Sequence, residues 1–93
     1  MGTTTGAVAS VRPGAVAWRS VDDTVVLLDL GSSEYHSLNG TSSSLWCRLA
    51  DGGASRSDLV AALLEEYDVD VDTAATDVDA FLGRCRARGW LSA

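Results

Sequence analysis

The sequence lacks the long apolar runs, the signal peptide and the paired cysteines of membrane and secreted proteins. Runs such as Val25–Leu28 are far shorter than the about 20 residues that span a bilayer. The N-terminal residues Met1–Gly6 contain neither a basic nor an apolar stretch, so no signal peptide is predicted and we expect a cytoplasmic protein. Cys47 and Cys85 lie far apart and form no Cys-x-x-Cys pair, which argues against a disulfide framework and a zinc site.

Positive charge is also scarce. All seven basic residues are arginine, and thirteen Asp and Glu residues oppose them, which leaves a formal net charge of −6. A chain this acidic repels phosphate backbones, so the charge balance disfavours a nucleic-acid partner.

The remaining composition is that of an ordinary globular domain. The chain has 93 residues, of which 46% are apolar and 22% charged, and this length is typical of one domain with a small core. Residues 1–13 are mostly small and polar, and the Pro13-Gly14 pair marks a break at their end. We therefore predict a flexible N-terminal segment over 1–13 and a single domain over 14–91.

The N-terminal half predicts three strands, at residues 15–20, 24–30 and 34–38. Short turns separate them, so we expect an antiparallel meander with the second strand in the middle. The second strand has apolar residues on both of its faces, which predicts that both are covered.

The third strand is predicted to lie at the edge of the sheet unless a later part of the chain covers it. Alternation places Tyr35 and Ser37 on one face of this strand and His36 and Leu38 on the other. Unpaired backbone groups on an edge strand bond to water or to a partner, so an extended peptide can add there as a further strand.

The C-terminal half predicts three helices. Asn39 is placed to cap a helix over about 41–50, and Ser55 followed by Asp58 resembles a capping box for a second helix that runs to about Tyr67. The third helix is predicted from about Asp72, with Gly89 just beyond its end. Its apolar stripe has regular helical spacing and comprises Ala74, Ala75, Val78, Phe81, Leu82 and Cys85.

A peptide groove is one interpretation of this stripe, and a sealed core is the other. The groove would lie between strand 34–38 and the third helix. Val78 and Cys85 lie at the centre of the stripe, which favours the core for them, whereas Phe81 and Leu82 flank it and either could line a groove. Arg84 and Arg88 lie on one flank, where an acidic or aromatic peptide could meet them.

Calcium binding is a weaker alternative. Asp68, Asp70, Asp72 and Asp79 have the spacing of an EF-hand loop, but Thr73 stands where that loop needs glycine. The carboxylates are better explained as caps and dipole partners of the third helix. No spacing of His36 with either cysteine supports catalysis, so we expect no enzyme, no metal and no cofactor.

Several short motifs, in their order and spacing, resemble the PqqD family. They are Val26-Leu27-Leu28-Asp29-Leu30, Glu34-Tyr35-His36-Ser37-Leu38-Asn39, Leu45-Trp46, Asp51-Gly52, Asp77-Val78 with Phe81-Leu82, and Gly89-Trp90-Leu91. The resemblance covers about residues 14–91. It implies an α+β, winged helix-turn-helix-like domain with a three-stranded antiparallel sheet followed by three helices. Members bind the leader of a ribosomally made precursor peptide and present it to modifying enzymes.

Tyr35-x-x-Leu38-Asn39 ahead of Leu45-Trp46 looks most like the stand-alone members of lasso-peptide biosynthesis. That resemblance implies a leader peptide and a separate leader peptidase as partners, no catalytic residues, and a monomer or weak dimer. By the same resemblance the leader pairs with the third strand and faces the third helix. The implied leader-binding residues are Tyr35, His36, Ser37, Leu38, Asp77, Val78, Phe81, Leu82, Arg84 and Cys85.

A winged-helix DNA-binding regulator shares this architecture and is the alternative function. Such a protein would normally present basic residues on its recognition helix. The second predicted helix instead sets Arg56 against Asp58, Glu65 and Glu66, which argues for the peptide-binding adaptor.

Overall fold

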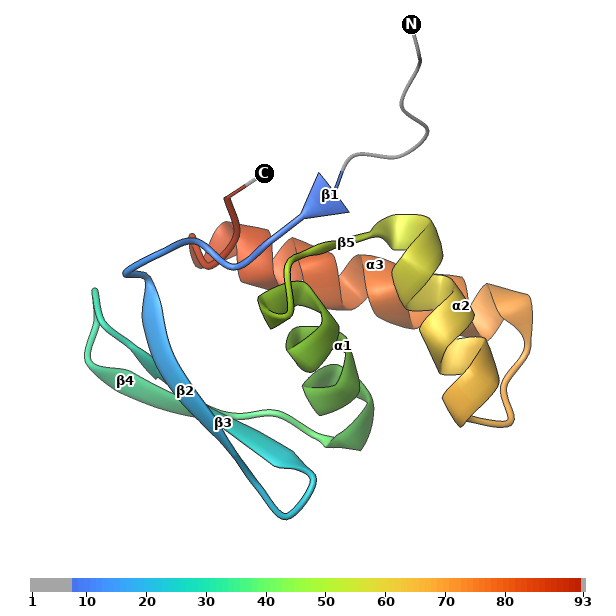
Figure 1. Cartoon of the computed structure of the whole chain (residues 1–93), viewed down its shortest axis with the longest axis horizontal. Helices are drawn as coiled ribbons and strands as arrows, with labels where there is room; N and C mark the ends of the chain where they lie inside the picture. The colour runs from blue at the N-terminus through green and yellow to red at the C-terminus, as the bar shows by residue number, and fades with distance from the viewer. Residues whose placement is uncertain (1–7, 93) are drawn as a thin grey trace, which may run out of the picture.

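A computed structural model of the chain describes residues 8–92. Strands come first and helices follow, with two very short strands added (Figure 1). The elements in order are β1 (Val8–Ala9), β2 (Val16–Val21), β3 (Thr24–Asp29), β4 (Glu34–Ser37), α1 (Gly40–Ala50), β5 (Ala54–Ser55), α2 (Arg56–Glu66) and α3 (Val71–Ala87). The α+β class, the meander and the three helices expected from the sequence are confirmed.

The main sheet has the order β2-β3-β4, and both pairings are antiparallel. Asp22 and Asp23, between β2 and β3, both have positive φ, at 49° and 63°. Positive φ at two central residues is the geometry of a type I′ turn, which matches the twist of a hairpin. The register sets Trp18 opposite Leu27, and Leu27 opposite His36, on one face of the sheet.

Side-chain caps fix the starts of the helices. The Oδ1 of Asn39 accepts the Ser42 N–H at 2.8 Å at the start of α1. Ser55 and Asp58 form the reciprocal capping box of α2, as the sequence predicts. Asp70 accepts the Thr73 N–H at 2.8 Å and begins α3.

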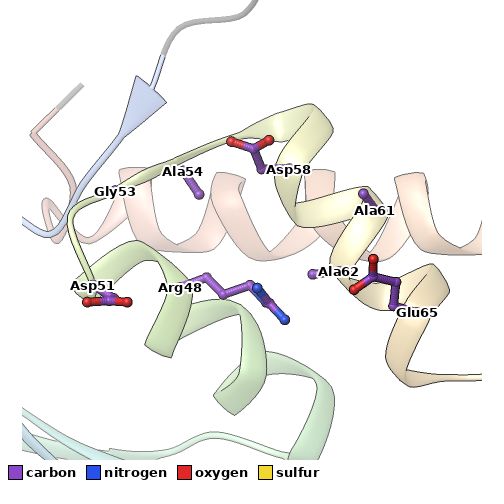
Figure 2. Close-up of a pocket in the computed structure, with 8 residues that line it drawn as sticks. All are labelled: Arg48, Asp51, Gly53, Ala54, Asp58, Ala61, Ala62 and Glu65. Carbon is purple, nitrogen blue, oxygen red and sulfur yellow. The ribbon is translucent and has the colours of Figure 1, made fainter.

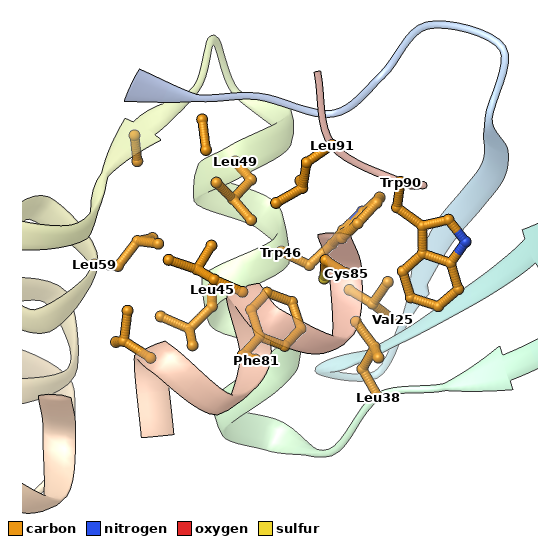
Figure 3. Close-up of a cluster of buried hydrophobic side chains, with 14 of the residues drawn as sticks. Val25, Leu38, Leu45, Trp46, Leu49, Leu59, Phe81, Cys85, Trp90 and Leu91 are labelled. Carbon is orange, nitrogen blue, oxygen red and sulfur yellow. The ribbon is translucent and has the colours of Figure 1, made fainter. Parts of the chain in front are cut away.

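The core lies between the inner face of the sheet and the helices (Figure 3). Val25 and Leu27 project inward from β3 and are fully buried. Trp46 of α1 is also fully buried, and its ring meets those of Trp18 and Trp90 edge-on, with centroids 6.2 and 6.0 Å apart. The three aromatic rings therefore join the sheet, α1 and the segment after α3.

The outer face of the sheet is open, and the prediction that both faces of the second strand are covered is wrong. Val26 and Leu28 are half-buried there, and Tyr35 beside them is 74% exposed. The helices lie on the inner side of the sheet, so nothing in residues 8–92 covers the outer one (Figure 1). Periodicity shows that a strand is apolar on both faces but not that a second layer exists.

Part of the N-terminal segment predicted to be flexible is paired. Val8 and Ala9 pair with β5, and Val11 bridges Leu91. Gly53 makes this approach possible, because a Cβ there would lie 2.8 Å from the carbonyl oxygen of Ala9. The rest of that prediction, residues 1–7, lies outside the described part of the chain. Within the described part, no helix has both the length and the apolar character needed to cross a membrane.

Candidate functional site

The free edge of β4 is the candidate site. The Leu38 N–H donates to the Val25 carbonyl at 2.9 Å, which makes these two residues a hydrogen-bonded pair. Backbone direction alternates along an antiparallel strand, so His36 also faces β3, whereas Tyr35 and Ser37 point their N–H and C=O groups away from it. No strand within residues 8–92 pairs with that outer side, so the edge predicted from the sequence is confirmed.

Ser43 of α1 terminates the pairing between β3 and β4. Its hydroxyl accepts the Val25 N–H at 2.8 Å and donates to the Leu38 carbonyl at 3.1 Å. Ser43 is buried, so a single hydroxyl satisfies two backbone groups that water does not reach. This contact fixes where the strand stops and the helix begins, which sets the length of the free edge.

Trp90 and its neighbours form a wall beside β4. The Trp90 and His36 rings are 5.1 Å apart at an interplanar angle of 72°. The Trp90 Nε1–H donates to Asp29 Oδ2 at 2.9 Å, and this bond is the main reason that the pKa of Asp29 lies below its usual value. Backbone N–H groups of Ser32 and Gly31 lower that pKa further.

Arg84, in the last turn of α3, and Arg88, the C-cap residue that follows it, stand beside the same strand. An Nη2–H of Arg84 donates to the Ser42 hydroxyl at 3.3 Å, next to the residue that caps the β4 ladder. The Arg88 guanidinium lies 5.6 Å from the centre of the Trp90 ring. Both arginines are exposed. The resemblance predicts Arg84 as a site residue. Asp29 and Trp90 belong to the motifs that carry the resemblance, but the sequence gives them no place in the site, and it gives Ser43 no signal, because only the fold brings these residues to this edge.

The apolar residues predicted to face the leader are all part of the core. Val78, Phe81, Leu82 and Cys85 are at most 3% exposed, so Phe81 and Leu82 do not line an open groove in this structure. Burial raises the pKa of the Cys85 thiol to about 12, which leaves it an inert, small apolar side chain. Asp77 is exposed on α3. Contact of these residues with a leader stays a prediction.

The calcium-loop alternative is wrong. Most of the segment with EF-hand spacing is the first half of α3, with Asp70 as its cap. Asp79 accepts two hydrogen bonds from Arg56, at 2.6 and 3.0 Å, so the last position of the motif already has a partner. In the part of the chain that the structure describes, no three His, Cys, Asp or Glu side chains gather as a metal ion requires.

Away from β4, a hollow of about 350 Å³ lies between α1 and α2 (Figure 2). Its polar groups are largely engaged: Asp58 belongs to the capping box, and Arg48 binds Glu66 at 2.7 Å. Asp51 and Glu65 also line it, so its wall is acidic on balance. Among the described residues, those that line it include no Ser, Thr, Cys, His or Lys.

Comparisons with known proteins agree with this geometry. The family model for coenzyme PQQ synthesis protein D (PqqD) matches residues 24–91. The structure of TbiB1 in complex with the TbiA(beta) leader peptide is similar, with a TM-score of 0.80 and 31% identity over 89% of this chain and 94% of that one. Lasso peptide synthetase B1 complexed with the leader peptide matches with a TM-score of 0.78 and 32% identity, over 94% of this chain and 100% of that one.

No curated protein sequence matches this chain. The family model nevertheless spans well over half of it, and each of the two solved structures covers most of it at more than 30% identity. The chain therefore belongs to the PqqD family.

Proposed function

We propose that this protein is a non-catalytic adaptor that captures the leader of a ribosomally synthesised precursor peptide. The leader adds as a strand to the free edge of β4, and the adaptor presents it to a separate leader peptidase and to other modifying enzymes of lasso-peptide biosynthesis. One observation carries the proposal: no strand of residues 8–92 pairs with the outer edge of β4, in a fold whose two similar solved structures were determined with leader peptides.

The chemistry of the edge suits an extended peptide of variable sequence. Tyr35 and Ser37 together offer two N–H donors and two carbonyl acceptors to an incoming strand. Each such bond contributes about 0.5–1.5 kcal/mol net, and a disordered leader loses conformational entropy on binding. Backbone pairing alone therefore gives modest affinity, and side-chain anchors must supply the rest.

DNA binding has no comparable support. Arg56 is the sole basic residue of α2, the second of the three helices, and it is already paired with Asp79. Hydrogen bonding to that carboxylate also raises the pKa of Arg56, as expected for a committed ion pair.

Fluorescence anisotropy tests the proposal directly. The probes are the labelled TbiA(beta) leader peptide, a scrambled peptide of the same composition, and a labelled DNA duplex. We expect saturable binding of the leader at least about tenfold tighter than that of the scrambled peptide, and no binding of the duplex at physiological salt. Equal binding of leader and scrambled peptide, or tighter binding of the duplex, would contradict the proposal.

The absence of catalysis has its own test. The leader is incubated with the purified protein alone and followed by mass spectrometry. We expect its mass to remain unchanged, because a separate peptidase performs the cleavage. Specific cleavage that persists after repeated purification would show that the chain is more than an adaptor.

A further inference from the structure

The arginines of this acidic chain are unevenly used. Arg48 and Arg56 are paired with carboxylates, Glu66 and Asp79. The other five arginines form no ion pair within residues 8–92, and two of them, Arg84 and Arg88, lie near β4. Arg84 donates to the Ser42 hydroxyl and lies over the Phe81 ring, and Arg88 lies over the Trp90 ring. Near β4, Arg84 and Arg88 are therefore two cations without a carboxylate partner, on a chain whose formal net charge is −6.

Both groups stand along one side of the β4 edge. Arg84 reaches Ser42, which adjoins the serine that holds the Leu38 carbonyl at the end of the strand. Arg88 lies over Trp90, whose ring contacts His36 near the middle of the strand. The two arginines are one helical turn apart, or about 6 Å along the axis of α3.

This spacing matches an extended peptide. Residues i and i+2 of a strand lie on the same face, about 6.6 Å apart. A strand added to β4 turns every second side chain toward α3, the helix that carries Arg84 and Arg88. Each guanidinium has five N–H donors in a planar fork that fits a carboxylate, and Arg84 uses one of them on a hydroxyl.

We propose that Arg84 and Arg88 form an anion-binding wall beside β4 and that they recognise acidic side chains, Asp or Glu, on the α3-facing side of the leader. This inference rests on the proposed function and specifies the chemistry of the ligand. Basic residues near a helix C-terminus also favour the helix dipole, but that role does not require the charges to lie beside β4.

Arg86 supplies a matched control. It lies in the same last turns of α3 and is exposed, so it complements the dipole equally. It is two residues from both Arg84 and Arg88, which places it about 200° around the helix from each of them. Arg86→Gln therefore makes the same charge change on the opposite side of α3.

A charge scan of the peptide tests the inference. Each residue of the TbiA(beta) leader is replaced in turn by Glu and by Lys. The Kd of each peptide is measured for the wild-type protein, for the R84Q/R88Q double variant and for the R86Q control. The net charge of the chain alone favours Lys at every position, so a local preference for Glu has the opposite sign to this background. Circular dichroism of each variant checks that it is folded.

We expect Glu to bind about fivefold more tightly than Lys at alternating positions of the pairing segment at low salt. The preference should disappear in the double variant and persist in R86Q. Leader binding without any local preference for Glu, or an equal loss in R86Q, would overturn the anion-binding wall but leave the adaptor proposal intact. Failure of the unmodified leader to bind the wild-type protein would overturn both.

Discussion

In the part of the chain that the structure describes, the sheet has two free margins, at β2 and at β4, and they differ in what lies beside them. Next to β2, the Leu30 N–H donates to the Ala15 carbonyl at 3.0 Å. Backbone direction alternates from that pair, so Trp18 and Ser20 point their N–H and C=O groups away from β3. Tyr35 and Ser37 do the same on β4. Both strands therefore present unpaired N–H and C=O groups. Backbone geometry alone does not distinguish the two margins.

The side-chain surroundings do distinguish them. A hollow of about 370 Å³ lies next to β2, and its lining includes Ser20 and the carboxylates of Asp23 and Glu66. Trp90 with its hydrogen-bonded partner Asp29, and the guanidinium groups of Arg84 and Arg88, lie next to β4. The backbone groups of an open edge can pair with any extended peptide, and the side chains beside the edge determine which peptide binds tightly. We therefore locate peptide recognition at β4, and the predictions below test this asymmetry.

Loss of the Ser43 hydroxyl should have the largest effect, because it closes the ladder between β3 and β4. Ser43→Ala leaves the buried Val25 N–H and Leu38 carbonyl without partners, so we expect a loss of about 2 kcal/mol in the free energy of unfolding. Ser57→Ala, at an exposed position of α2, should change it by less than about 0.5 kcal/mol. Urea denaturation measures both, and equal midpoints for the two variants would refute this role of the hydroxyl.

Matched prolines compare the two margins directly. Ser37→Pro removes an outward N–H from β4, and Ser20→Pro removes the equivalent N–H from β2. We expect Ser37→Pro to weaken binding of the TbiA(beta) leader by about tenfold or more. The substitution removes one hydrogen bond to the leader, and the leader carbonyl that accepted it is left without a partner. Ser20→Pro should change it less than twofold. A reversed pattern in the anisotropy titration would move the site to β2.

The wall beside β4 should be visible in the titration of Asp29. Trp90→Phe removes the indole N–H that stabilises the ionised carboxylate, so the pKa of Asp29 should rise toward its usual value. Because the pKa of Asp29 is lower in the folded protein than in the unfolded chain, the ionised carboxylate stabilises the fold. This contribution is complete at pH values above the unfolded-state pKa of about 3.9, and it is lost as the pH falls through the folded-state pKa. The variant should therefore lose part of that stability at neutral pH.

NMR titration of the Asp29 carboxyl in the wild type and the variant measures this change. An unchanged pKa in a folded Trp90→Phe protein would show that the indole does not hold the carboxylate.

The two cysteines provide the mildest test. Cys47 is exposed and lines the hollow beside β2, whereas Cys85 is buried in the core. At pH 8 a thiol reagent should modify Cys47 alone in the folded protein, because burial keeps the Cys85 thiol protonated. The modified protein should bind the leader with less than a twofold change in Kd. A large loss of binding would implicate the β2 side.

Much of the local structure follows from the sequence. Asn39, Ser55 and Asp70 cap the helices because their short polar side chains reach backbone N–H groups a few residues away. The turn at Asp22-Asp23 and the edge position of strand 34–38 follow in the same way from local patterns. Such features depend on neighbours in the chain, so the sequence contains what is needed to predict them.

The features of the site that depend on long-range packing could not be predicted. Phe81 and Leu82 flank a helical stripe, but whether a flank is open depends on how α3 sits on the sheet, and both are buried. The bridge made by Ser43 and the contact between Trp90 and Asp29 join residues 18 and 61 positions apart. No periodicity encodes contacts of that kind.

Residue-resolved amide exchange by NMR, with and without the TbiA(beta) leader, tests the central claim most directly. If the leader completes the sheet at β4, the Tyr35 and Ser37 amides, which face outward in the free protein, should exchange at least about tenfold more slowly in the complex. The outward amides of Trp18 and Ser20 on β2 should be unaffected. Slower exchange at β2, or an unchanged rate at Tyr35 and Ser37 with the leader bound, would contradict the account.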